Sequence, residues 1–183
     1  MRINRMASVP LLVHDPYFSI WSSADCLYDA DTAHWSGKEK RLYGHITADG
    51  ERFRFLGGED GYPVIPQTSL EVTPTATTYT FENEKLRLFV RFLSPLLPED
   101  PVLVSRPCTY VDFTVSRKQE VSVKIDFTVT GDLVFDTPGK IIGGSHENET
   151  YHFHYGTMRK AFQTPLGHSG DRITIDWGDM ILA

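Results

Sequence analysis

Alternation of apolar and polar residues dominates the chain and predicts β-strands. The clearest case is 121–129, where Val, Ile or Phe occupies every second position and Ser, Lys, Asp or Thr lies between. A period of two buries one face of a strand and leaves the other face in water. The same alternation occurs in segments 75–81, 86–92, 110–115, 151–155 and 173–177. No stretch of about 12 residues repeats its apolar positions with the 3.6-residue period of an α-helix.

Two of the links between strands predict hairpins. Asp49-Gly50 separates segment 45–48 from segment 52–56 and favours a type I′ turn, because both central residues of that turn need a positive φ. The short polar link 117–119 joins two alternating segments, and we expect these segments to form a second hairpin. Other links differ: four prolines make 94–107 a stiff, extended connection, and 57–66 is a Gly- and Pro-rich loop.

The complete pattern predicts an all-β fold. About nine or ten short strands, separated by Gly, Pro, Asp and Asn, are typical of an antiparallel β-sandwich. We divide the chain into an N-terminal module, 1–66, packed on the sandwich, and a β-sandwich module, 67–183. The last four residues are Met-Ile-Leu-Ala, an apolar strand rather than a polar tail. We therefore expect the second module to be incomplete at its C-terminal end.

Composition excludes several classes of protein. The 183 residues are 40% hydrophobic and carry a formal net charge of −6, so the chain lacks the basic surface that nucleic acids need. No apolar run approaches the roughly 18 residues of a membrane span. No leader-like apolar segment follows Arg2 and Arg5. We expect a cytoplasmic protein, or an extracellular or periplasmic one whose leader was removed.

The cysteines and histidines predict neither a disulfide framework nor a metal site. Cys26 and Cys108 are too few for a disulfide framework, and we favour buried thiols over a bridge. His152 and His154 would leave the same face of a strand, with Cα atoms about 7 Å apart, which is a metal-ligand spacing. His146 or a nearby glutamate could supply a third ligand. Any polar strand face can hold two histidines, so we favour a solvated or hydrogen-bonded face and expect no metal and no cofactor.

A second cluster combines tryptophans with carboxylates between residues 15 and 35. It contains Asp15, Trp21, Asp25, Asp29, Asp31, His34 and Trp35. Such a group could stack a sugar ring and bind its hydroxyls, or provide a general acid and base. Alternatively, the aspartates cap turns and the tryptophans are core residues. We favour the structural interpretation, and retain Trp21, His34 and Trp35 as one wall of a possible cleft. We assign no catalytic residue.

Several ordered motifs together resemble the opening region of the glutaminase A family. They are DPYFSIWS at 15–22, TAHWSG at 32–37, LYGHITADG at 42–50, RFLG at 54–57, SRPCTYV at 105–111 and GHSGDRITIDWG at 167–178. The resemblance extends over nearly the whole chain. In structural terms, we expect His34 to lie in a turn with a buried ring, Asp171 and Asp176 to flank a strand, and Trp177 to close the core.

The resemblance implies a much longer parent protein. Family members begin with β-sandwich modules, continue into an α-helical toroid, and hydrolyse L-glutamine to L-glutamate and ammonia. This chain would then be a non-catalytic N-terminal part that braces a missing helical domain, with glutamine binding only in the intact protein. No catalytic residue of the family falls on the motifs. The alternative is a carbohydrate-binding module, or the sandwich half of a protein like a glycoside hydrolase.

Overall fold

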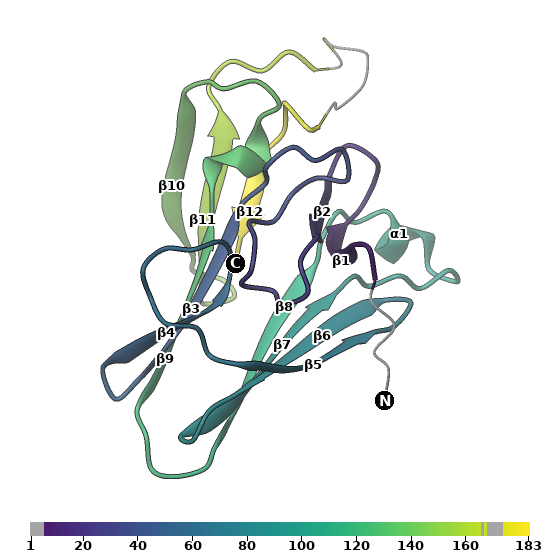
Figure 1. Cartoon of the computed structure of the whole chain (residues 1–183). Coiled ribbons are helices and arrows are strands. Elements are labelled where there is room, and N and C mark those ends of the chain that lie inside the picture. Colours follow the sequence, from purple (N-terminus) through teal and green to yellow (C-terminus); the bar gives the residue numbers. More distant parts are fainter. Residues whose placement is uncertain (1–5, 166, 168–173) are drawn as a thin grey trace.

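A computed structural model describes residues 6–165, 167 and 174–183, and these residues form an almost entirely β structure (Figure 1). The strands are β1 (Val9–Val13), β2 (Ser19–Ser22), β3 (Leu42–Ala48), β4 (Glu51–Leu56), β5 (Gln67–Val72), β6 (Ala76–Glu82), β7 (Leu86–Leu93), β8 (Tyr110–Arg117), β9 (Val123–Val129), β10 (Ile141–Asn148), β11 (Phe153–Lys160) and β12 (Met180–Leu182). Two single-turn helices are α1 (Pro101–Val104) and η1 (Gly131–Val134). The predicted all-β class is confirmed, with more strands than the nine or ten expected.

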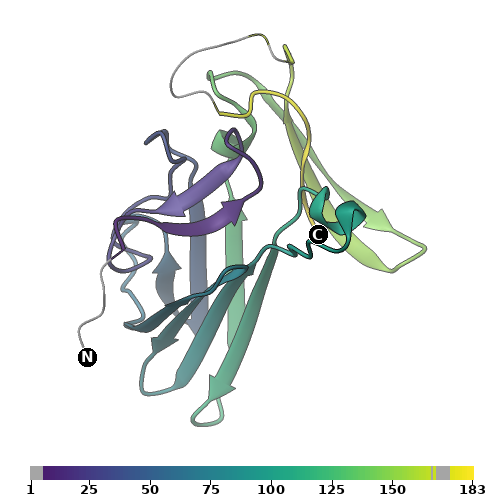
Figure 2. The ribbon, with the colours of Figure 1, turned by 90° about the vertical axis from the view of Figure 1, so that its right-hand side faces the viewer.

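Two antiparallel sheets face each other and form the sandwich. One has the strand order β5-β6-β7-β8 and the other the order β4-β3-β9. Figure 2 shows the two sheets in separate layers, and the buried side chains of the core lie between them. Aromatic rings join the sheets: the ring centroids of Phe55 and Phe81 are 5.8 Å apart, and those of Phe113 and Phe127 are 5.7 Å apart. The alternation in the sequence directs these rings inward.

The core is completely buried under the centre of both sheets. The inward apolar side chains of β6 and β7 are at most 1% exposed: Tyr79, Phe81, Leu86, Leu88, Val90 and Phe92. On β3, Gly44 leaves room for the ring of Phe55, because a Cβ atom there would lie 2.3 Å from that ring. The Phe55 ring therefore lies closer to the backbone of β3 than it could if position 44 carried a side chain.

The predicted β3–β4 hairpin is confirmed, whereas the predicted hairpin of 110–115 with 121–129 is wrong. Asp49 has a φ of 51° and Gly50 a φ of 83°, as a type I′ turn requires. By contrast, β8 pairs with β7, and β9 pairs with β3 in the opposite sheet. The link between β8 and β9 therefore crosses from one sheet to the other. Alternation identifies the buried face of each strand but does not name its neighbour.

Two smaller sheets lie at one end of the sandwich. The hairpin β1-β2 packs against β6 and β7, and the sheet β10-β11-β12 extends beyond the sandwich (Figures 1 and 2). Residues 174–177 are not a strand, so that part of the predicted strand 173–177 is wrong, and residue 173 lies outside the described residues. Trp177 does not close the core, because it is 41% exposed.

The remaining sequence predictions have mixed outcomes. The connection 94–107 contains helix α1, which begins at Pro101 with Asp100 as its N-cap, so it is not extended throughout. Cys26 and Cys108 are both free thiols and only half-buried. In the described part of the chain, no helix has the length and apolar character needed to cross a membrane. The sheet β4-β3-β9 contains strands from both sides of the predicted module boundary at residue 66.

Candidate functional site

His34 and Trp35 form a compact group around the carbonyl of Pro16. The Nε2 atom of His34 lies 2.8 Å from Pro16 O, and the indole Nε1 of Trp35 donates to the same oxygen at 2.7 Å. Because a carbonyl only accepts, His34 carries its proton on Nε2, and its Nδ1 accepts from Ser36 Oγ at 2.7 Å. His34 is 2% exposed, as predicted, but Trp35 is 61% exposed and is not a core residue.

Trp21 lies next to this group through its backbone. The backbone N–H and C=O of Trp21 form hydrogen bonds with the C=O and N–H of Ala33. Trp21 therefore lies alongside the segment that leads into the His34 turn. The indole Nε1 of Trp21 donates to Ser19 Oγ at 3.1 Å, and the side chain is half-buried. The structure thus brings the three predicted residues into one region, and their role as a cleft wall stays a prediction.

Asp15 and Asp29 of this cluster act as turn caps, as the structural interpretation predicts, whereas Asp31 binds a loop 27 positions away. Asp15 Oδ1 accepts the backbone N–H groups of Tyr17 and Phe18. Asp29 Oδ2 accepts the N–H of Cys26, and Asp31 Oδ1 accepts the N–H of Gly58. These bonds use the carboxylates to hold loops in place.

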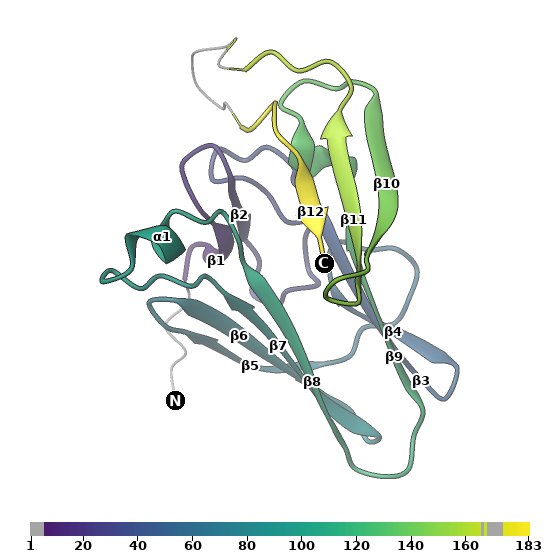
Figure 3. The same ribbon diagram turned by 180° about the vertical axis from the view of Figure 1, so that it is seen from behind.

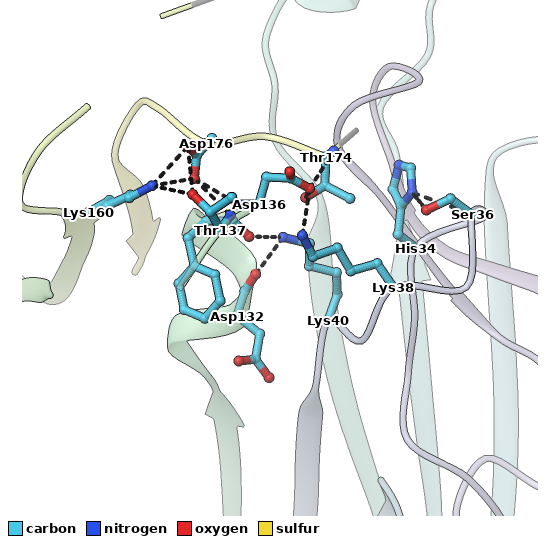
Figure 4. A network of polar contacts seen from close by, with 11 residues as sticks. His34, Ser36, Lys38, Lys40, Asp132, Asp136, Thr137, Lys160, Thr174 and Asp176 are labelled. Atoms are coloured by element: carbon cyan, nitrogen blue, oxygen red, sulfur yellow. Dashed lines mark hydrogen bonds and ion pairs between the residues drawn. The ribbon is translucent and has the colours of Figure 1, made fainter. Parts of the chain in front are cut away.

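Beside His34, Asp136 joins three distant segments. Its Oδ1 accepts from Lys38 Nζ at 2.7 Å and from both the N–H and the hydroxyl of Thr174, at 3.2 and 3.1 Å (Figure 4). Burial alone would raise the pKa of Asp136, but the bonds from Lys38 and Thr174 outweigh it and hold the pKa below its usual value. Asp136 is therefore an anionic junction between the loop before β3 and the segment before β12.

Asp176 also binds a lysine and a backbone N–H group through its carboxylate, and the N–H group belongs to Asp136. Both of its carboxylate oxygens lie 2.9 Å from Lys160 Nζ on β11, and its Oδ1 accepts the backbone N–H of Asp136 at 2.7 Å (Figure 4). Burial raises the pKa of Asp176, and the bonds from Lys160 and the backbone lower it further than burial raises it. The segments carrying Asp136 and Asp176 thus clasp each other, and we call Lys38, Asp136, Thr137, Lys160, Thr174 and Asp176 the clasp.

Lys40 is a buried amine at the centre of this region. Its Nζ donates to the carbonyls of Asp132 and Phe135, at 2.6 and 2.5 Å, and lies 5.8 Å from the Phe135 ring centroid. Burial, together with the charge of Lys38, lowers the pKa of Lys40 to about 8. The carbonyls end the helix η1, so Lys40 closes the end of that turn.

The arrangement suits holding segments together better than turning over a substrate. Each acid and amine of the clasp is bound to a partner, and Lys40 donates to two carbonyls. A nucleophile or general base needs a free position toward a substrate. Trp35 is different, because its side chain is 61% exposed, although its N–H binds Pro16 O and its ring lies 5.2 Å from that of His34.

The weak metal candidates are not assembled into a site. His152 lies in the turn before β11 with a φ of 54°, so the predicted placement of His152 and His154 on one strand face is wrong. His146 on β10 stacks on Tyr155 with centroids 5.0 Å apart, and its Nε2 lies 3.1 Å from Thr157 Oγ1. Among the described residues, no group of three or more His, Cys, Asp or Glu side chains could hold a metal ion.

Sequence reasoning missed most of the clasp. Lys38, Asp136, Thr137 and Lys160 lie in segments with no recognisable motif, and Lys38 and Asp136 are 98 positions apart. Of the clasp residues, Thr174 and Asp176 belong to the motif at 167–178, which could have drawn attention to them. Asp171 from the same motif lies outside the described residues.

Comparison with known proteins now places the chain in a family. Residues 75–183, more than half of the chain, match the family described as "Domain of unknown function (DUF5127)", and the chain belongs to this family. Residues 3–65 match a second model, "Domain of unknown function (DUF4964)". No solved structure matches the chain significantly.

Two curated relatives carry glutaminase names. Glutaminase A of Aspergillus oryzae is 30% identical over 119 residues, which cover 61% of this chain and 17% of the relative. A protein of Arthroderma benhamiae named "Probable glutaminase" is 25% identical over 147 residues, covering 68% of this chain and 17% of the relative. These relatives confirm the resemblance to the glutaminase A family. The chain matches only about 17% of the length of each relative.

Proposed function

We propose that this chain is the non-catalytic N-terminal β-sandwich part of a glutaminase-like amidohydrolase. The whole protein would hydrolyse L-glutamine to L-glutamate and ammonia, and this part would brace a helical domain that carries the catalytic residues. The names of the curated relatives support the activity. The 17% coverage supports a longer protein with further domains.

The clasp is the observation that carries the bracing role. Its carboxylates are held by Lys38 and Lys160, and these pairs link residues 98 and 16 positions apart. Breaking such a partly buried ion pair is costly, so the pairs hold these segments together, and each carboxylate is already bound to a lysine. We therefore propose that the clasp keeps the region next to Trp35 rigid.

A side-by-side assay tests the proposal. Ammonia release from L-glutamine is measured for the complete gene product and for residues 1–183, with D-glutamine as the control substrate. We expect turnover only from the complete product. Turnover by residues 1–183 that is lost in the Lys40→Met variant would overturn the non-catalytic role, and an inactive complete product would overturn the glutaminase activity.

Trp35 offers a test of contact with the substrate cleft. In the complete product, Trp35→Ala would raise KM for glutamine and leave kcat nearly unchanged if the indole lines the cleft. Tyr151→Ala is the matched control, because Tyr151 is an exposed aromatic residue in the turn before β11. Equal kinetic effects of the two substitutions would remove Trp35 from the cleft wall.

The exposed indole of Trp35 also favours a second candidate, a carbohydrate-binding module. Its side chain is 61% exposed while its N–H is fixed by Pro16, and an exposed indole is suited to stacking on a sugar ring. Titration of tryptophan fluorescence with a panel of oligosaccharides tests this function, with Trp35→Phe as the control. A saturable change that disappears in the variant would support it, and the absence of any saturable change would exclude it.

A further inference from the structure

One side of the sandwich is much less buried than the other. The inward apolar side chains of β6 and β7 are at most 1% exposed. The inward apolar side chains of β8 and β9 are only half-buried, although they pack against the same core: Val111, Phe113, Val115, Val123, Ile125, Phe127 and Val129. We call this row of seven side chains the β8–β9 seam. A row of apolar side chains of this length is seldom left partly wet in a stable sandwich.

The backbones beside the seam are also unpaired. β8 and β9 are the last strands of their sheets, and each pairs on one side only among the residues that the structure describes. The edge of β4 is treated differently, since the loop after it bonds to Arg54 through Pro63 O and the N–H of Ile65. An uncovered edge is a template for another strand.

The seam has the position and shape of a strand-binding site. Figure 3 shows β8 and β9 below β12, with the C-terminal end of the chain lying between their upper ends in this view. Met180 on β12 already packs against the core. A segment that continued from Ala183 in the direction of β12 would run toward the edges of β8 and β9.

We propose that the β8–β9 seam binds a further β-strand of the same polypeptide, supplied by sequence beyond residue 183. The strand would hydrogen-bond to the free edge of β8 or β9 and place alternate apolar side chains between the sheets. This inference rests on the proposed function, because only a longer protein contains the strand. The added strand would complete the sandwich at the seam.

A second copy of this chain fits the seam less well. A two-fold interface would pair β8 with β8, or β9 with β9, and would extend one sheet sideways. Such a pairing would cover the same free edges as the proposed strand, so the oligomeric state distinguishes the two occupants. A strand from the same polypeptide needs no second chain, because the C-terminal end of β12 already lies beside the seam (Figure 3).

Hydrogen exchange on the unsubstituted protein tests the proposal. The amides of β8 and β9 that point away from β7 and β3 exchange freely if the edges are open, and slowly if a strand covers them. We expect rapid exchange in residues 1–183 at a concentration where light scattering shows a monomer. In the complete gene product we expect the same amides to be protected at least 100-fold.

Thiol labelling gives a second readout. Cys26 and Cys108 are replaced by serine, and Val115→Cys then introduces one thiol facing the seam. We expect a maleimide to label it at least 10-fold more slowly in the complete product than in residues 1–183. Thr114→Cys is the matched control, because Thr114 is exposed on the opposite face of β8, and its labelling should be equal in both proteins.

Three results would overturn the proposal. They are protection of the edges in monomeric residues 1–183, protection that appears only where residues 1–183 dimerise, and open edges in the complete product. The ammonia assay is independent of these readouts. Protected edges in a product without glutaminase activity would therefore reject the proposed function and retain the strand site.

Discussion

At the scale of single residues, His34 couples the stability of the fold to pH. Burial lowers the pKa of His34 from its ordinary value of 6.5, against the bond to Pro16 that raises it. The unfolded chain therefore binds a proton more readily than the folded chain, so stability is complete above pH 6.5 and falls as the pH drops below it. Protonation of Nδ1 would also remove the acceptor for Ser36.

The first prediction concerns the slope of stability against pH. We expect the His34→Gln variant to lose less stability than the unsubstituted chain between pH 7 and pH 5, measured by urea unfolding at each pH. His14 retains part of the slope, because burial lowers its pKa too. His154→Gln, a substitution at an exposed position, is the matched control. An unchanged slope in His34→Gln would contradict the lowered pKa of His34.

The second prediction concerns the carboxylate of Asp176. Asp176→Asn leaves Lys160 without its anion in a site where that side chain is 13% exposed. We expect a loss of about 3 kcal/mol in the free energy of unfolding, as for other buried ion pairs from which one partner is removed. Asp112→Asn breaks the exposed pair with Arg91 and should cost less than about 1 kcal/mol. Equal losses in the two variants would mean that the clasp is solvated.

At the scale of elements, the third prediction tests how β3 accommodates β4. Gly44→Ala would place a Cβ atom 2.3 Å from the Phe55 ring, so the ring or the strand must move. We expect a loss of about 1–3 kcal/mol in stability, as for overpacked cores. The double variant Gly44→Ala/Phe55→Leu should recover part of this loss. The losses are measured by thermal unfolding. If the losses of Gly44→Ala and Phe55→Leu add in the double variant, the contact between these two positions does not cause the loss of stability.

At the scale of the whole molecule, the fourth prediction follows the gradient of burial across the sandwich. Phe81→Ala removes a fully buried ring and should cost about 3–5 kcal/mol. Phe127→Ala removes a half-buried ring at the seam and should cost roughly half as much in residues 1–183. The complete gene product should show a larger loss for Phe127→Ala. Equal losses for both rings in residues 1–183 would indicate a seam that is already closed.

Local signals in the sequence predicted the features that depend on neighbouring residues. Asp49-Gly50 specifies its own turn, and Asp15 caps a turn two and three residues away. The strand partners of β8 and β9 were not predictable in this way, because alternation is the same whichever strand lies alongside. The clasp was missed for a related reason: Lys38 and Asp136 meet only after the sheets have packed.

By itself, the sequence determined the all-β class, the inward face of most strands, the β3–β4 turn and the resemblance to the glutaminase A family. These depend on side-chain alternation, local turn chemistry and ordered motifs, which are properties of short segments. The tertiary structure alone decided the crossing from β8 to β9, the exposure of Trp35 and Trp177, the clasp and the half-buried seam. Each of these depends on which distant segments come into contact, and the free energy of that packing is not encoded in any one segment.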